Sequence, residues 1–174
     1  MTAVPVVVRA ATLADAEAIG RVHVLAWQAA YVGQMPQKYL DGLDADERAS
    51  HWRRVLSTSR EHAPVLVGET AGEVAGFATF GPARDDPDTS DGELYVVNVR
   101  PDRWGSGVGG ALLAAVHAGL AGLGYRSAVL WVLPGNQRAR AVYEHLGWRL
   151  DGAERTDEAF GVLVPEVRYR RPMP

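Results

Sequence analysis

A cluster of glycines between an apolar segment and a helical pattern constrains the fold of this chain more than any other feature. Residues 94–97 are apolar, four glycines fall within residues 105–110, and a helical pattern opens at Ala111. Glycines allow positive φ and a close approach of the backbone to a ligand. The open N–H groups and the dipole at a helix N-terminus favour phosphate. The order strand, glycine turn and helix therefore predicts a phosphate site.

Two common phosphate-binding motifs do not explain this turn. Gly105, Gly107 and Gly110 match the dinucleotide fingerprint, but that motif needs an acidic residue about 20 positions later. No Asp or Glu occurs between Arg103 and Tyr143. A Walker A loop needs a Gly-Lys-Ser/Thr tripeptide, which the chain lacks. A turn that only packs a helix on a strand explains one or two glycines rather than four. The formal charges in the acid-free stretch are all arginines, which attract a ligand with several phosphates.

The remaining patterns predict one α/β domain over residues 1–174, built on a mixed sheet. The expected order is β-α-α-β-β-β-α-β-α-β-β, and its combination of hairpins and crossover helices favours a mixed sheet over a parallel one. Caps are expected at Thr12, Asp44 and Asn136, and a further helix is expected from the glycine turn to about Leu123. Residues 82–92 are expected to form a loop. The expected strands are 6–10, 64–69, 74–81, 93–99, 127–133, 148–153 and 162–170.

Composition argues against several other kinds of site. The formal net charge of −3 gives no reason to expect a nucleic-acid partner. The absence of cysteine excludes disulfides, thiolate catalysis and zinc-thiolate sites, and we expect no metal. Residues 1–8 lack the basic and apolar regions of a signal peptide, and no apolar run is long enough to span a bilayer. We therefore expect a cytoplasmic protein without a membrane partner.

Two motifs in this order resemble those of the GNAT superfamily of N-acetyltransferases. The family's acetyl-CoA signature is Arg or Gln, two residues, Gly, one residue, and Gly or Ala. The matching run is Trp104–Gly109, with Trp104 at the position of Arg or Gln. The segment Asn136–Trp148 resembles the family's Asn-x-x-Ala-x-x-x-Tyr-x-x-x-Gly-Phe. The resemblance covers nearly the whole chain, is strongest over residues 93–148, and implies a GNAT-like fold with a splayed central strand pair.

By this resemblance, the chain uses acetyl-CoA as its acyl donor. The strand 93–99 would diverge from the strand 127–133, so that the backbone groups of Val97 and Val99 bind the pantetheine arm. The N–H of Val97 would polarise the thioester carbonyl. The N–H groups of the glycine turn would hold the pyrophosphate, and Asn136 would bond the ligand near the pantetheine. The expected cofactor-binding residues are thus Val97, Val99, Trp104, Gly105, Ser106, Gly107, Val108, Gly109, Gly110 and Asn136.

The resemblance also implies direct attack of an amine on the thioester, which requires a general acid and a route for the amine's proton. Tyr143 is the predicted acid, because a phenol with a pKa of about 10 can reprotonate a thiolate of similar pKa. Its position on an apolar helix stripe also fits a packed tyrosine. Glu93 is the predicted base, since some family members carry a catalytic Glu on this strand. A solvated Glu at the end of an acidic loop is the alternative.

The acceptor is the least defined part of this prediction. The family's acceptor site is usually shaped by the first two helices and the final hairpin, and His23 there is either a base or a packed histidine. Aromatic and acidic residues of this region are Trp27, Tyr31, Tyr39, Trp52, Asp41, Asp44 and Asp46. A small-molecule amine and an amine of a peptide or protein both remain open, and a homodimer is plausible. A catalytically silent CoA sensor or regulatory module is the alternative function.

Overall fold

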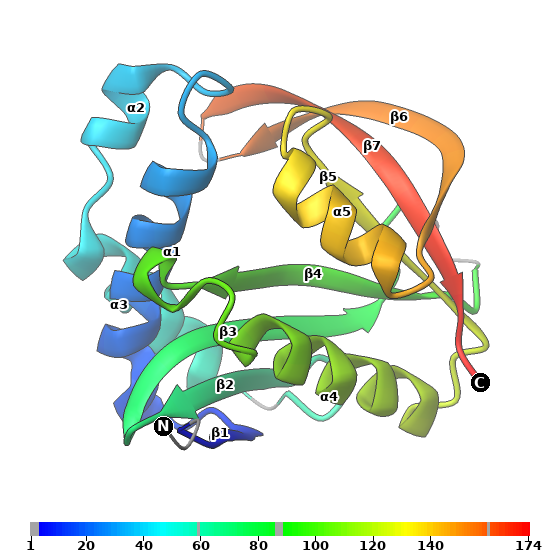
Figure 1. Ribbon diagram of the computed structural model, residues 1–174, viewed down its shortest axis with the longest axis horizontal. Coiled ribbons are helices and arrows are strands. Elements are labelled where there is room, and N and C mark those ends of the chain that lie inside the picture. Colours follow the sequence, from blue (N-terminus) through cyan, green and yellow to red (C-terminus); the bar gives the residue numbers. More distant parts are fainter. Residues whose placement is uncertain (1–3, 59, 86–88, 160) are drawn as a thin grey trace.

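Seven strands form one continuous mixed sheet in the computed structural model, which describes residues 4–58, 60–85, 89–159 and 161–174 (Figure 1). The strand order is β1-β2-β3-β4-β5-β7-β6. The pair β4–β5 is parallel and the other neighbouring pairs are antiparallel, which confirms the predicted mixed α/β sheet. The strands are β1 (Val6–Ala10), β2 (Val65–Thr70), β3 (Glu73–Pro82), β4 (Gly92–Val99), β5 (Ser127–Val132), β6 (Arg149–Ala159) and β7 (Val162–Pro172).

Helices cover both faces of this sheet. The helices are α1 (Ala16–Ala30), α2 (Gln37–Asp41), α3 (Ala45–Leu56), α4 (Val108–Gly122) and α5 (Gln137–His145). Successive side chains of a strand point to opposite faces. Phe77 of β3 packs with α1 and α3, whereas Ala78 and Phe80 belong to the core under α4. Tyr143 of α5 joins the core of α4. Within the described ranges, no helix has the length and apolar character needed to cross a membrane.

The helix ends follow the sequence signals. The side chain of Asp44 accepts hydrogen bonds from two N–H groups in the first turn of α3, at 2.8 and 2.9 Å. The side chain of Asn136 accepts one from the N–H of Ala139 at 3.3 Å and caps α5. Gly124 and Gly147 follow the C-terminal ends of α4 and α5 with φ of 91° and 90°. Glycine adopts this left-handed conformation at little cost, so both helices end where predicted.

The central strands β4 and β5 pair only at one end. Their parallel register covers Gly92, Glu93 and Leu94, opposite Ala128, Val129 and Leu130. Beyond Leu94, β4 remains paired with β3, and β5 remains paired with β7. The strands therefore diverge, as the family resemblance implies. In Figure 1, α5 and the ribbon of β4 lie on either side of this divergence.

Two elements differ from the prediction. Strand β6 continues to Ala159 instead of ending at Ala153, because its charged second half pairs with β7 although it lacks an alternating apolar pattern. Helix α2 was not predicted, since five residues are too few to show a helical period. In the expected loop 82–92, β3 extends to Pro82 and β4 begins at Gly92, while residues 86–88 lie outside the described residues.

Candidate active site

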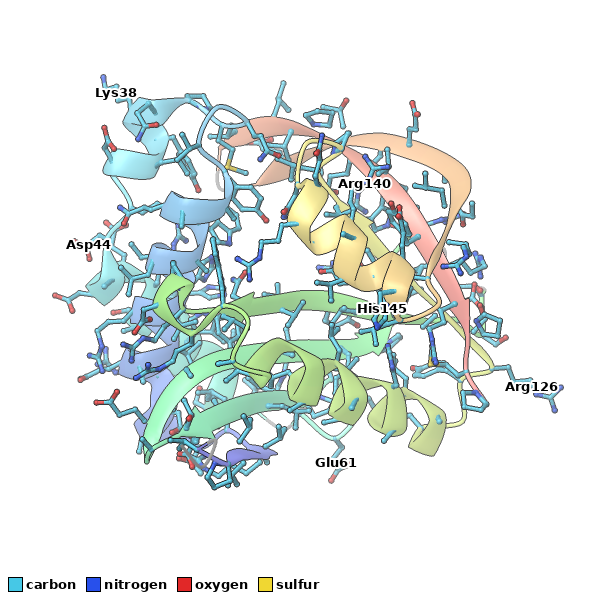
Figure 2. The ribbon with its side chains drawn as sticks, viewed as in Figure 1. Lys38, Asp44, Glu61, Arg126, Arg140 and His145 are labelled. Atoms are coloured by element: carbon cyan, nitrogen blue, oxygen red, sulfur yellow. The ribbon has the colours of Figure 1, made fainter. Side chains whose placement is uncertain are left out.

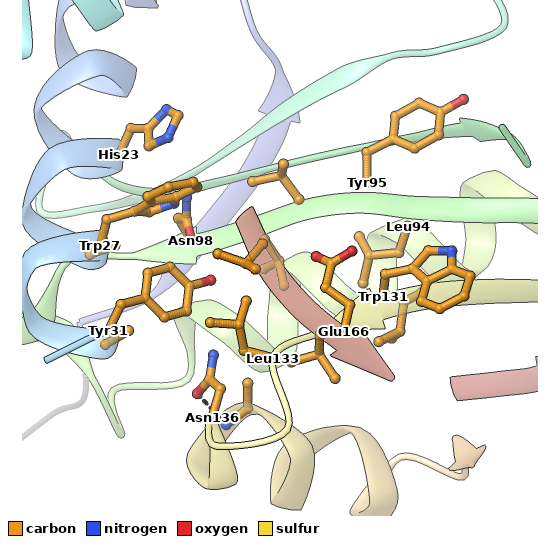
Figure 3. A pocket seen from close by; sticks show the side chains of 18 of the residues that line it. His23, Trp27, Tyr31, Leu94, Tyr95, Asn98, Trp131, Leu133, Asn136 and Glu166 are labelled. Carbon is orange, nitrogen blue, oxygen red and sulfur yellow. Dashed lines mark hydrogen bonds between the residues drawn. The ribbon is translucent and has the colours of Figure 1, made fainter. Parts of the chain in front are cut away.

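A cavity of about 820 Å³ lies where β4 and β5 diverge (Figure 3). Its walls come from α1, β4, β5, α5 and the β6–β7 hairpin. The predicted site residues that line it are Glu93, Val97, Val99, Trp104, Gly109, Asn136 and Tyr143. The remaining predicted residues belong to the turn and first helical turn around the N-terminus of α4, outside the cavity wall: Gly105, Ser106, Gly107, Val108 and Gly110.

The backbone of β4 presents polar groups to this cavity at Val97 and Val99. In the pairing of β4 with β3, Val99 lies opposite Gly76. The next residue, Arg100, donates its N–H to the carbonyl of Ala75 in β3 at 2.8 Å. Backbone groups of successive strand residues point alternately toward and away from the partner. Those of Val97 and Val99 therefore point away from β3, toward the opening. The Val99 carbonyl already accepts a hydrogen bond from the indole N–H of Trp104 at 2.9 Å.

The glycine turn leaves a helix N-terminus open. Gly105 and Gly107 have φ of 76° and 93°, and a Cβ added to either residue would meet no described atom within 4 Å apart from those of the adjoining residues. The first hydrogen bond of the α4 helical ladder runs from the N–H of Ala111 to the carbonyl of Gly107 at 3.0 Å, so the N–H groups before it have no partner in the ladder. The N–H of Ser106, in contrast, is already used within the turn. Both it and the Ser106 hydroxyl donate to the Arg103 carbonyl, at 3.2 and 2.6 Å.

Tyr143 combines burial with access to the cavity. It is 8% exposed, and its ring packs edge-on against Trp148 with 6.4 Å between the centroids. Burial raises the pKa of Tyr143 above its ordinary value of 10.0, and the nearby Tyr31 raises this pKa further. The phenol is therefore protonated at neutral pH.

Glu93 is a buried carboxylate held by Arg84. It is 1% exposed, which excludes the solvated alternative. Its Oε2 accepts hydrogen bonds from the backbone N–H of Arg84 at 2.9 Å and from Nε at 3.3 Å, and its Oε1 accepts from Nη2 at 2.7 Å. The Arg84 guanidinium also lies over the ring of Tyr95, 4.3 Å from the centroid. Arg84 thus covers both oxygens of Glu93, and the sequence did not single it out.

The wall formed by β6 and β7 carries further charged residues that the sequence analysis missed. Glu166, which lies at the centre of the view in Figure 3, accepts a hydrogen bond from Nε of Arg155 at 2.7 Å. Arg155 also forms an ion pair with Asp85 at 2.6 Å, and the indole N–H of Trp131 donates to the carboxylate of Asp85. Burial raises the pKa of Glu166, while Arg155 opposes this shift. The register that sets Arg155 opposite Glu166 has no signal in the non-alternating sequence of β6.

Aromatic rings from α1 complete the cavity. Trp27 and Tyr31 form an edge-to-face pair with centroids 5.2 Å apart. Burial first, and then the charge of Glu166, raise the pKa of Tyr31 to about 12, while a side-chain hydrogen bond with Asn136 acts in the opposite direction. Nδ1 of His23 accepts a hydrogen bond from the Trp52 indole at 3.3 Å, and burial lowers the pKa of His23 to about 3. His23 is therefore a neutral, packed residue.

The match to a known protein family decides what this arrangement is. The model of the acetyltransferase (GNAT) family matches residues 24–148. This chain belongs to the GNAT acetyltransferase family. It is 37% identical over 163 residues to the N-acetyltransferase YuaI of Bacillus subtilis (strain 168), covering 93% of this chain and 90% of YuaI. The chain is therefore an acyltransferase.

Solved GNAT structures share its fold. The PaiA N-acetyltransferase of Thermoplasma acidophilum, solved in complex with coenzyme A, matches with a TM-score of 0.73 and 17% identity over 97% of this chain and 99% of PaiA. The acetyltransferase YncA of Salmonella typhimurium, solved with its cofactor acetyl-CoA, matches with a TM-score of 0.72 and 24% identity over 98% of this chain and 95% of YncA. The chain therefore shares the overall fold of these two proteins.

Some residues of the cavity lie within the segment that matches the GNAT family model, and others follow it. Residues 24–148 include Glu93, the glycine turn and Tyr143, whereas Arg155 and Glu166 lie beyond them in the β6–β7 hairpin.

Within the part of the chain that the structure describes, no cluster of three or more His, Cys, Asp or Glu is arranged to hold a metal ion.

Proposed function

We propose that this acetyltransferase moves an acetyl group from acetyl-CoA to a primary amine by direct attack in a ternary complex. The observation that carries this proposal is the divergence of β4 from β5 beside a cavity lined by Tyr143. The pantetheine arm would lie along β4, with the N–H of Val97 donating to the thioester carbonyl as negative charge develops there. The pyrophosphate would lie at the N-terminus of α4. The acetyl-CoA and CoA held by the YncA and PaiA structures support this donor.

The attacking nitrogen gives up one proton as the amide forms and the departing sulfur gains one, and an amine that arrives as an ammonium first loses a further proton to solvent. The amine nitrogen attacks the thioester carbonyl carbon, a C–N bond forms, and the C–S bond breaks to release CoA as a thiolate. Tyr143 would give its proton to that sulfur, because the phenol is protonated at neutral pH and lines the cavity. Glu93 would accept the proton of the amine through a water molecule, because Arg84 covers both carboxylate oxygens.

Glu166 is the proposed contact for the acceptor. Its carboxylate lies in the cavity wall, and Arg155, its bonded partner, is shared with Asp85 and Asp157. One guanidinium therefore faces three carboxylates, which leaves negative charge for a protonated amine. The rings of Trp27 and Tyr31 would pack against the apolar part of the amine acceptor. This chemistry accommodates a small-molecule amine and the amine of a peptide or protein.

Calorimetric titration with acetyl-CoA tests the first half of this proposal, and thiol release with a panel of primary amines tests the second. We expect saturable acetyl-CoA binding at sub-millimolar ligand, followed by release of CoA that depends on the added amine. Absence of binding would refute the proposed donor. Binding without release on any amine would favour a CoA-sensing module over an enzyme.

A further inference from the structure

Trp104 and Arg138 make a contact that the family motifs do not require. The guanidinium carbon of Arg138 lies 3.5 Å from the centroid of the Trp104 ring. Trp104 precedes the glycine turn after β4, and Arg138 lies in the first turn of α5, after β5. Both side chains line the cavity. The contact therefore joins the two sides of the opening between β4 and β5.

Arg138 is a positioned cation without an acidic partner. It takes part in none of the ion pairs between described residues, and no Asp or Glu occurs in the sequence from Trp104 to Val142. The N–H groups of a guanidinium lie in its own plane, so they remain free to donate at its edges when its face covers an indole ring. Trp104 is itself fixed, because its indole N–H donates to the Val99 carbonyl. The stack thus presents donors from a defined position.

The position of Trp104 in the sequence suggests what these donors bind. Trp104 occupies the place where the acetyl-CoA signature usually has Arg or Gln, so this chain lacks the usual side chain there. The same turn leads to the open N–H groups of α4, which favour phosphate. Arg138 brings a guanidinium to this end of the cavity from another helix.

We propose that Arg138, held in place by Trp104, binds the pyrophosphate of the acyl donor and takes over the contact expected from the motif's Arg or Gln. A guanidinium can give two parallel N–H bonds to phosphate oxygens, while the first-turn N–H groups of α4 approach the same group. This inference rests on the proposed function, since it assumes a CoA ester as donor.

Calorimetric binding of CoA and of dephospho-CoA, which lacks the 3′-phosphate, tests the assignment. Loss of charge-assisted hydrogen bonds in Arg138→Ala should weaken both ligands by roughly 10- to 100-fold. The matched control is Arg126→Ala, which removes the same charge from an exposed side chain beyond the far end of α4 (Figure 2) and should leave both affinities unchanged. Thermal unfolding of each variant checks that the fold is intact.

A second variant separates ligand binding from a structural role. In the Arg138→Ala background, Trp104→Arg restores the family's residue and should recover most of the lost affinity, which a packing defect at Arg138 would not allow. No recovery, or equal affinities of wild type and Arg138→Ala, would overturn the inference. A loss confined to CoA, with dephospho-CoA unaffected, would also overturn it, because the contact would then be to the 3′-phosphate. If the wild type binds neither ligand, the proposed function fails as well.

Discussion

The carboxylate of Glu93 accepts three hydrogen bonds from Arg84, one from the backbone N–H and two from the guanidinium. In the proposed mechanism, Arg84 would thus stand between an amine and the oxygens of Glu93, and the proton would pass through a water molecule. We expect Glu93→Gln to lower kcat by about 10²-fold, because the amide cannot take the proton. The dissociation constant of acetyl-CoA should not change. Steady-state kinetics and calorimetry measure the two quantities.

A matched control for Glu93 is the exposed Glu61 (Figure 2). Glu61→Gln makes the same chemical change at the surface and should leave kcat at the wild-type value. Wild-type turnover in Glu93→Gln would remove Glu93 from the mechanism and make it a structural partner of Arg84.

Glu166 should act on acceptor affinity. We expect Glu166→Gln to raise KM for a protonated amine about tenfold, because a charge-assisted hydrogen bond is lost. The change in kcat should be smaller, and acetyl-CoA binding should be unaffected. Glu154→Gln, on an exposed position of β6, is the control. An unchanged KM in Glu166→Gln would show that the ammonium group binds elsewhere.

The buried pair of His23 and Trp52 predicts a loss of stability in mild acid. Burial lowers the pKa of His23 from 6.5 to about 3, so the folded chain excludes a proton that the unfolded chain binds below pH 6.5. The free energy of unfolding should therefore fall as the pH drops from 6.5 toward 3, by about 1 kcal/mol per pH unit from this residue. His117, whose pKa is lowered to about 4 by burial, acts in the same direction.

Urea unfolding at about pH 6 and pH 5 measures this slope. His23→Gln keeps a hydrogen-bond acceptor for the Trp52 indole but binds no proton, so it should show a shallower pH dependence than the wild type. Identical slopes for the two proteins would mean that His23 titrates normally in the folded state.

Two glycines of α4 should respond in opposite ways to the same substitution. A Cβ at Gly119 would overlap the buried ring of Phe80, whereas a Cβ at Gly122 meets nothing within 4 Å in the described structure. We expect Gly119→Ala to lower the free energy of unfolding by about 1–3 kcal/mol through overpacking. Gly122→Ala should raise it by about 0.5 kcal/mol by restricting the unfolded chain. Chemical denaturation compares the two, and equal effects would contradict the packing at Phe80.

The parts of this protein that were predictable from sequence depend on local physical signals. Caps at Asp44 and Asn136 and glycines after helix ends have short-range causes, so the helix boundaries were predicted closely. The two family motifs led to Tyr143 and the glycine turn. Arg84 and the pair of Arg155 with Glu166 were missed because their placement depends on loop geometry and strand register, which no local pattern specifies. The contact between Trp104 and Arg138 could not be predicted either, since Arg138 lies 34 positions away on another helix.

The most direct test of the central claim is the release of free thiol from acetyl-CoA across a panel of primary amines, measured for the wild type and for Tyr143→Phe. We expect amine-dependent release by the wild type and a kcat about 10²- to 10⁴-fold lower in Tyr143→Phe, because the thiolate then lacks its proton donor. Acetyl-CoA binding should be equal in the two proteins. Equal turnover by wild type and Tyr143→Phe would contradict the assignment of Tyr143 as the general acid.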